Sequence, residues 1–253
     1  MTIPPETLLP FLAVAAVAGY FQTVTGFGLG MIVIGLSSGL GIASVATVAT
    51  VVSLLMVVNS VVALPGKLQY VHWPAIRAVI VGLLPAILGG VLILDYLSAS
   101  ASRLLQLVLG GLILYGGVSM LLQPSRQTSL SSSMSFFVSG VLSGLCGGLF
   151  ATPGPPLIYQ CYRQPLPLIG ISSMLILFFA ITSLVRTLFI AFQGQLDTEI
   201  LVLTAWSIPV IAVTTYAGRR FPPPLSAVMM RRLAFLVLVG IGGGLIGASL
   251  DIL

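Results

Sequence analysis

Two stretches rich in glycine and proline, residues 22–30 and 144–156, could bind an anion largely through backbone groups. The first reads QTVTGFGLG and the second reads GLCGGLFATPGPP. Proline removes a backbone donor and glycine allows dihedral angles that other residues avoid, so each stretch should interrupt a helix. A helix that restarts after such a break directs free N–H groups and the positive end of its dipole toward the gap.

The candidate anion ligands in these stretches are the residues of the two breaks and the polar side chains beside them. They are Gln22, Thr25, Gly26, Phe27, Gly28, Gly147, Gly148, Thr152, Pro153, Gly154 and Pro155. The alternative is close packing, because small residues let two membrane helices approach each other. Finding a break at equivalent places in both halves of the chain favours the binding site.

Arg186 is the most informative single charge, because it lies inside the apolar segment Leu166–Phe192. A charged residue within a membrane span indicates function, and a guanidinium suits an oxyanion. Asn59 occupies the nearly equivalent position in the first half, so we count both as candidate ligands. The alternative for Arg186 is that its side chain extends to the outer interface.

The composition places most of this chain in lipid. Hydrophobic residues make up 58% and charged residues 6% of the 253 residues, and the mean hydropathy is +1.17. A soluble domain carries about a quarter charged residues. The net charge of +5 comes from single or paired basic residues at the ends of apolar segments. That distribution follows the positive-inside rule of membrane proteins and argues against nucleic-acid binding.

The chain should therefore be an all-α polytopic membrane protein with little room for a soluble domain. The expected apolar segments are Leu8–Val24, Phe27–Leu40, Ala43–Leu64, Pro74–Leu94, Arg103–Leu122, Met134–Phe150, Pro155–Tyr162, Leu166–Phe192, Ile200–Ala217 and Ala227–Leu250. Two of them, Phe27–Leu40 and Pro155–Tyr162, are too short to cross about 30 Å of hydrocarbon. Each follows a break and comes second in its half.

The second half repeats the first. Gly66 and Leu68 match Gly194 and Leu196, and the two breaks also correspond, at offsets of about 121 to 128 residues. We therefore divide the chain into a first transmembrane repeat (1–122), a connecting loop (123–133) and a second repeat (134–253). Each repeat should contain a broken or re-entrant hairpin followed by three spanning helices.

Charge predicts that the two repeats are inverted. The loop around Gly66 holds Lys67, whereas its counterpart around Gly194 holds Asp197 and Glu199. Conversely, the loop expected around Asp95 is nearly neutral and its counterpart is strongly basic. Equivalent loops would then face opposite sides of the membrane. Inverted repeats are typical of secondary transporters, whose sites lie near the midplane where broken helices meet.

The TGFG sequence of the first break and the TPGPPLI sequence of the second resemble the sulfite exporter TauE/SafE family, also called the 4-toluene sulfonate uptake permease family. The resemblance covers the whole chain. It implies a secondary transporter of small sulfur-containing anions, such as sulfite or organosulfonates, in the bacterial inner membrane. The expected partners are the anionic substrate and the lipid bilayer, with homo-oligomer formation left open. The first break lacks adjacent glycines and a following proline, so the two half-sites could contribute unequally.

Other functions remain open from the sequence. They are a carrier or channel for another small organic anion and a non-transporting membrane scaffold, for which a dry, filled midplane would be expected. An enzyme is disfavoured because no nucleophile motif or cluster of histidine and carboxylates occurs. Cys146 and Cys161 suggest neither a disulfide framework nor a metal site, and no cofactor is expected. The five carboxylates fall in expected loops or chain ends, which offers no proton relay within the membrane.

Overall fold

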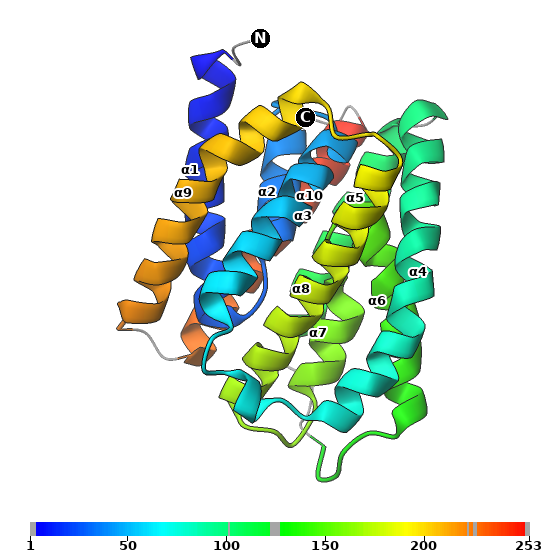
Figure 1. The fold of residues 1–253 in the computed structure, drawn as a ribbon, viewed down its shortest axis with the longest axis vertical. Helices are drawn as coiled ribbons and strands as arrows, with labels where there is room; N and C mark the ends of the chain where they lie inside the picture. The colour runs from blue at the N-terminus through cyan, green and yellow to red at the C-terminus, as the bar shows by residue number, and fades with distance from the viewer. Residues whose placement is uncertain (1–3, 101, 122–126, 222, 225–226, 251–253) are drawn as a thin grey trace.

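The computed structural model describes residues 4–100, 102–121, 127–221, 223–224 and 227–250. Within these ranges the chain forms ten α-helices and one short 3-10 helix, without β-strands (Figure 1). The helices are α1 (Pro5–Thr25), α2 (Leu29–Gly39), α3 (Val45–Ala63), η1 (Leu68–Tyr70), α4 (Trp73–Ser100), α5 (Ser102–Leu121), α6 (Ser133–Phe150), α7 (Gly154–Tyr162), α8 (Leu168–Phe192), α9 (Thr198–Arg220) and α10 (Ala227–Ser249). The predicted all-α membrane fold is confirmed.

Six helices in the described part of the chain are long and apolar enough to cross a membrane, namely α1, α3, α4, α6, α8 and α9. The two segments predicted to be short are α2, with 11 residues, and α7, with 9 residues. At 1.5 Å per residue they extend about 16 and 14 Å, so neither crosses the hydrocarbon alone. Each is the returning arm of a hairpin with the helix before it. The predicted connecting loop 123–133 lies partly outside the described residues.

One helix is longer than the sequence predicts. We expected the fourth segment to end at Leu94, with Asp95 in a loop, but α4 continues to Ser100. Asp95 therefore lies in the last turns of a helix, where its carboxylate accepts hydrogen bonds from Gln193 and Gln195. The expectation failed because a single carboxylate near a helix end does not stop an otherwise apolar helix.

Local sequence explains where the principal helices begin and end. Ser44, Ser132 and Asp197 accept hydrogen bonds from backbone N–H groups as the N-caps of α3, α6 and α9. Helix α1 ends at Gly26, which has a φ of 88° and whose N–H donates to the Gln22 carbonyl. This left-handed C-cap suits glycine and turns the chain into the first break.

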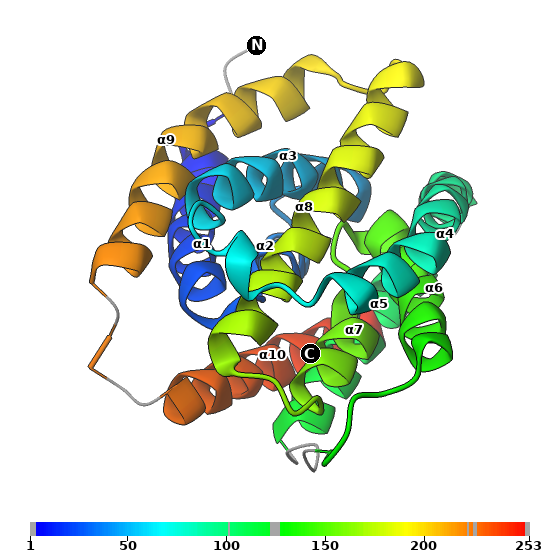
Figure 2. The ribbon, with the colours of Figure 1, turned by 60° about the horizontal axis from the view of Figure 1, so that its bottom comes forward.

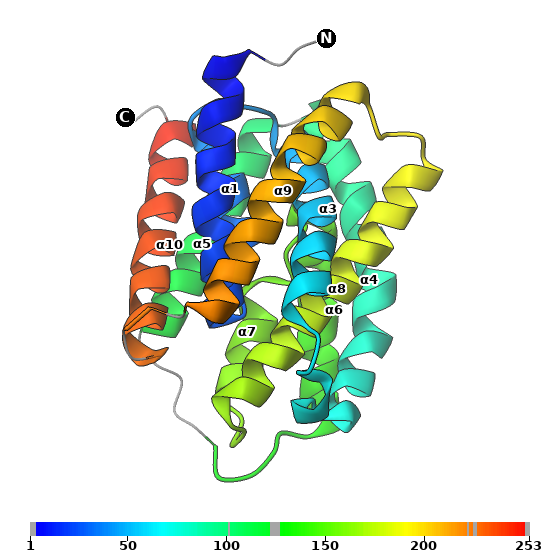
Figure 3. The ribbon, with the colours of Figure 1, turned by 60° about the vertical axis from the view of Figure 1, so that its left-hand side comes forward.

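The helices pack in pairs that link the two halves of the sequence. Helix α4 packs on α6, α5 on α10, and α1 on α9. Figures 1 and 3 show α1 and α9 side by side and the α3–α8 pair beside them. If α1–α5 are matched with α6–α10 in order, contacting pairs of helices map onto other contacting pairs. The α4–α6 pair maps onto α9–α1, and the α5–α7 pair maps onto α10–α2.

Glycines bring α4 and α6 into close contact. A β-carbon built on Gly140, Gly144 or Gly148 of α6 would lie 2.3, 2.5 and 2.2 Å from the carbonyl oxygens of Val79, Leu83 and Ile87. Only a hydrogen fits at this separation. Gly148 therefore allows close helix packing, which was the alternative to anion binding for this residue. Its carbonyl has a second role, described below.

Candidate functional site

The two helix breaks meet inside the protein. A β-carbon on Gly30, near the start of α2, would lie 3.1 Å from Cβ of Thr152 in the second break. Tyr162 at the end of α7 donates a hydrogen bond of 2.9 Å to the carbonyl of Thr25 in the first break. The ring of Phe27 meets that of Tyr162 edge-on, with centroids 6.1 Å apart. The breaks are buried and turned toward each other, as a shared site requires.

The first break is held in shape by its own polar side chains. Gln22 is fully buried, and its Oε1 accepts a hydrogen bond of 3.1 Å from the N–H of Leu29, the first residue of α2. The hydroxyl of Thr25 donates to the carbonyls of Phe21 and Phe27, both at 2.8 Å. Gln22 thus satisfies one of the N–H groups that the sequence suggested would be free for an anion.

Positive φ angles explain the glycines of the first break. Gly26 and Gly28 have φ values of 88° and 113°, in the left-handed region that a side chain disfavours. A β-carbon on Gly26 would also lie 3.0 Å from Cα of Ser172 on α8. These glycines shape the turn and let α8 approach it, which is a positioning role.

In the second break, a side-chain hydroxyl is a better candidate anion ligand than the backbone N–H groups. Helix α7 begins Gly154-Pro155-Pro156, and the two prolines carry no N–H. The ring of Pro155 lies against Gly116 of α5. The hydroxyl oxygen of Thr152 is buried and has no hydrogen-bond partner among the described residues. Thr152 is therefore the strongest candidate ligand that this break supplies.

Arg186 is fully buried and connects three helices. From α8, its Nε donates to the carbonyl of Gly148 on α6 at 2.9 Å. Its Nη1 donates to the carbonyl of Ala49 at 2.9 Å and to the hydroxyl of Ser53 at 2.8 Å, both on α3. The alternative in which this side chain extends to the membrane interface is wrong, because these bonds hold it inside the protein.

The guanidinium of Arg186 keeps unused capacity for an anion. Its Nη2 is buried and has no hydrogen-bond partner within the described part of the chain. The three bonds it does make all go to uncharged oxygens. A buried cation without a paired anion is costly, and a buried donor without a partner adds to that cost. Binding a small anion at Nη2 would relieve both.

Neighbouring contacts tie Arg186 to the helix breaks. Gly30 lies against Val52, the residue before Ser53, as well as against Thr152. Thr182, one turn before Arg186 on α8, lies against Gly147, the residue before Gly148. The hydroxyl of Thr182 is also buried without a partner in the described residues. The orphaned polar atoms of Arg186, Thr152 and Thr182 therefore belong to one region of the core.

Asn59 lies outside the cluster around Arg186. Its Nδ2 donates to the hydroxyls of Thr23 on α1, at 3.2 Å, and Thr215 on α9, at 2.7 Å. It follows Ser53 by six residues on α3, which is about 9 Å along the helix axis. The structure thus separates Asn59 from the Arg186 cluster, although the sequence placed them at nearly equivalent positions.

Sequence reasoning missed Ser53 and Tyr162. Ser53 is far in sequence from Arg186, and Tyr162 is far in sequence from Thr25, which are the residues that they contact, and neither forms part of a glycine-rich motif. A weak signal existed for Ser53, because Thr47, Thr50 and Ser53 recur every third residue and give α3 a polar strip.

Two cavities flank this region, and Arg186 lines neither. One, of about 470 Å³, lies between α3 and α8 and is almost wholly apolar. The other, of about 530 Å³, lies among α5, α6 and α7 and includes Ser135, Gln160 and Arg163. The Arg186 cluster is therefore closed off from both.

Buried helix breaks that meet beside a buried arginine whose three hydrogen bonds go to uncharged oxygens, in an all-helical membrane fold, define a secondary transporter of anions as the class of protein. The chain belongs to the Sulfite exporter TauE/SafE family, whose family model matches residues 11–245. It is 56% identical over 243 residues to a Cupriavidus necator protein named probable sulfite/organosulfonate exporter TauE. The match covers 95% of each of the two chains. No solved structure matches the chain.

Family membership confirms the resemblance drawn from the two break motifs. It places the chain among multi-pass transporters of the bacterial inner membrane and not among enzymes. It also favours transport over a membrane scaffold.

Proposed function

We propose that this protein exports small sulfur-containing anions, such as sulfite or an organosulfonate, and binds them at Arg186. The observation that carries the proposal is a fully buried guanidinium whose Nη2 has no partner among the described residues and whose other bonds go to uncharged oxygens. A sulfite or sulfonate group presents several oxygen acceptors to such a donor. Export follows the name of the Cupriavidus relative.

The bound group would lie between Arg186, Thr152 and Thr182. Arg186 supplies charge and a charge-assisted hydrogen bond, and the two threonine hydroxyls supply neutral donors. Gly30 and Gly147 let the neighbouring helices pack closely against these threonines, since a β-carbon would lie 3.1 Å from Cβ of Thr152 and 2.5 Å from Cγ2 of Thr182. The residues Gln22, Thr25, Gly26 and Gly28 would act by holding the first break, whereas Phe27 and Tyr162 would form its apolar wall.

Two inverted repeats, 1–122 and 134–253, would provide alternating access. Two observations support this arrangement: the helix pairs interchange between halves, and α1 and α6 run in opposite directions. In Figures 1 and 3, α1 descends from the N-terminus at the top, while α6 rises from the loop at the bottom. The hairpins α1–α2 and α6–α7 then enter from opposite sides.

The basic end of the molecule would face the cytoplasm. The ends of α3, α7 and α9, near which Lys67, Arg163 and Arg219 lie in the sequence, are in the lower part of Figure 1, whereas the end of α4 and the start of α9, near Asp95 and Asp197, are toward the top. The positive-inside rule assigns the basic end to the cytoplasm. The cavity beside Arg163 would then be the cytoplasmic approach, since Pro156 of the second break is one of its lining residues.

Export needs no embedded carboxylate in this mechanism. A membrane potential of 100 mV, negative inside, does about 2.3 kcal/mol of work on each charge that crosses. This field expels an anion. A closed state in which Arg186 bonds α3 and α6 would open when one repeat rocks against the other and breaks those bonds.

Flux through proteoliposomes tests the proposal. Purified protein should release trapped sulfite or a small sulfonate, and an applied potential of the correct sign should accelerate release. Arg186→Gln should abolish most of the flux, and Arg186→Lys should retain part of it because the charge remains. Arg77→Gln, at an exposed arginine of α4, is the matched control.

Equal flux in Arg186→Gln and in the control, with both variants correctly folded, would refute the site. A wild-type protein that moves neither sulfite nor any sulfonate would refute the substrate class.

A further inference from the structure

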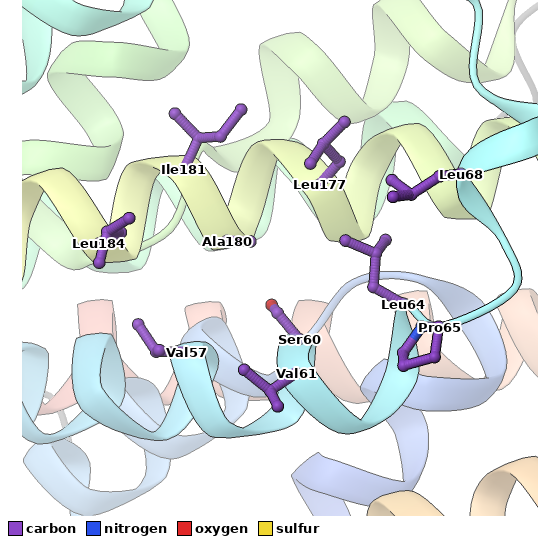
Figure 4. A pocket seen from close by; sticks show the side chains of 10 residues that line it. All are labelled: Val57, Ser60, Val61, Leu64, Pro65, Leu68, Leu177, Ala180, Ile181 and Leu184. Atoms are coloured by element: carbon purple, nitrogen blue, oxygen red, sulfur yellow. The ribbon is translucent and has the colours of Figure 1, made fainter.

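The cavity between α3 and α8 is a groove with an apolar lining. Its lining residues are Val57, Ser60, Val61, Leu64, Pro65, Leu68, Leu177, Ala180, Ile181 and Leu184. Figure 4 shows these side chains along two facing helices, with Leu64, Pro65 and Leu68 at one end and Val57 and Leu184 at the other. Val61 is 69% exposed and Leu184 is 50% exposed, so the groove opens on the outer surface of the helix bundle. In a membrane, that surface faces lipid.

A polar atom inside the groove has no partner. Ser60 is 4% exposed, and its hydroxyl makes no hydrogen bond among the described residues. In Figure 4 its oxygen points from α3 into the space before Ala180 of α8. A serine in a helix can donate to the carbonyl one turn earlier, as Ser53 does to Ala49 in the same helix. An ester or hydroxyl oxygen within the groove would be a suitable acceptor for Ser60.

Two cations lie at one end of the groove. Lys67 falls between the lining residues Pro65 and Leu68. Arg219 of α9 donates to the carbonyl of Pro65 at 3.4 Å and also to that of Val62. Burial and, less strongly, the charge of Arg219 lower the pKa of Lys67 below its ordinary value of 10.5. Within the described residues neither cation has a carboxylate partner, so the groove ends at an uncompensated pair of like charges.

Aromatic residues place this end at the membrane interface. Tyr70 and Trp73 follow Lys67 and are 44% and 48% exposed. Tyrosine and tryptophan gather at the level of the lipid headgroups. Figure 2, which brings the bottom of the molecule forward, shows η1 and the start of α4 together at this end. If this end is cytoplasmic, it faces the leaflet with the negative surface potential.

We infer that the α3–α8 groove binds an anionic phospholipid, with one acyl chain along the groove and the phosphate on Lys67 and Arg219. Charge complementarity selects an anionic lipid over a zwitterionic one, and the apolar length of the groove selects a lipid over a free anion. The site involves none of the residues proposed to bind the transported anion, so the inference stands independently of the substrate.

Lipid binding can be measured by titrating the detergent-purified full chain and counting retained lipids by native mass spectrometry. The probes are dioleoylphosphatidylglycerol, dioleoylphosphatidylcholine of the same chain length, and inorganic phosphate. Wild-type protein should retain phosphatidylglycerol in preference to phosphatidylcholine. Lys67→Gln should weaken phosphatidylglycerol binding about five-fold, since each basic residue near a charged lipid surface contributes about 1 kcal/mol.

Matched variants separate this site from general charge effects. Lys67→Gln/Arg219→Gln should lose more affinity than the single variant, whereas Arg77→Gln/Arg220→Gln removes two exposed basic residues outside the groove and should lose little. Ala180→Phe fills the groove and should lower retention of phosphatidylglycerol. Val213→Phe, at a site on α9 that is 67% exposed, should not. Because Arg219 also bonds carbonyls at the end of α3, Lys67→Gln remains the decisive variant if the double variant fails to fold.

Four results would overturn the inference. They are equal binding of the two lipids, equal losses in Lys67→Gln and in the Arg77/Arg220 control, unchanged retention in Ala180→Phe, and binding of inorganic phosphate as tight as that of phosphatidylglycerol.

Discussion

The Nε of Arg186 on α8 donates to the carbonyl of Gly148 on α6 at 2.9 Å, just before the second helix break. The same glycine has no room for a β-carbon, because α4 lies 2.2 Å from where that carbon would be. Gly148 thus contributes to the close approach of α4 and α6 and also orients the buried guanidinium. The packing that brings these helices together therefore also positions the proposed anion ligand.

Thr152→Val should weaken substrate affinity without loss of stability. The hydroxyl of Thr152 makes no hydrogen bond within the described residues, so valine of similar shape removes nothing from the fold. If the hydroxyl binds the anion, its loss should cost about 1 kcal/mol, or a several-fold rise in the KM for transport. Concentration-dependent efflux and thermal unfolding of the same preparation measure the two effects.

Thr25→Val is the matched comparison. The Thr25 hydroxyl already donates to two carbonyls, so its removal should lower the unfolding temperature and affect the KM less. An unchanged KM in Thr152→Val would remove Thr152 from the site.

The sequence predicted the breaks but not the geometry between them. Glycine and proline reveal a helix break directly, because they change which backbone angles and hydrogen bonds are possible. Charge inside an apolar run likewise singled out Arg186. Its partners on α3, Ala49 and Ser53, depend on how distant segments pack, which composition and spacing along one chain do not encode. For the same reason Asn59 was grouped with Arg186, although the structure bonds it to Thr23 and Thr215.

Gly148→Ala should destabilise the protein by about 1–3 kcal/mol through overpacking. The added methyl would meet the carbonyl of Ile87 and the α-carbon of Gly90, both of which are backbone atoms. Transport should fall as well, since a shift of α6 also moves the carbonyl that holds Arg186. Thermal unfolding and efflux measured in parallel test this expectation.

Gly244→Ala provides the control for that substitution. It lies in α10 with no heavy atom within 4 Å of an added β-carbon, so alanine should be neutral or stabilise the helix by up to about 1 kcal/mol. Equal unfolding temperatures for the two variants would contradict the close contact of α4 and α6.

Gln22→Leu tests whether Gln22 caps α2 or binds the substrate. Loss of the amide leaves the buried N–H of Leu29 without its acceptor, which should cost about 1–3 kcal/mol of stability. Gln22→Glu keeps an acceptor at that place, so it should preserve more of the fold than leucine does, at the cost of a buried charge beside an anion path. A normal unfolding temperature together with a raised KM in Gln22→Leu would instead make Gln22 a direct ligand.

Lys67 should make the stability of the protein depend on pH in alkaline solution. Burial and the nearby Arg219 hold its pKa in the folded state below the 10.5 of the unfolded chain. Between the folded and unfolded pKa of Lys67, the unfolded chain binds more protons than the folded one, so the stability of the protein rises with pH. Below the folded pKa, the free-energy cost of holding charged Lys67 in the folded protein does not change with pH. Wild-type protein should therefore gain about 1–3 °C in unfolding temperature relative to Lys67→Gln as the pH approaches 10.5, a small effect because the side chain is partly exposed. Saturating phosphatidylglycerol should reduce that difference, because a phosphate beside Lys67 favours its charged form. If the difference in unfolding temperature between the two proteins does not change with pH, folding does not lower the pKa of Lys67.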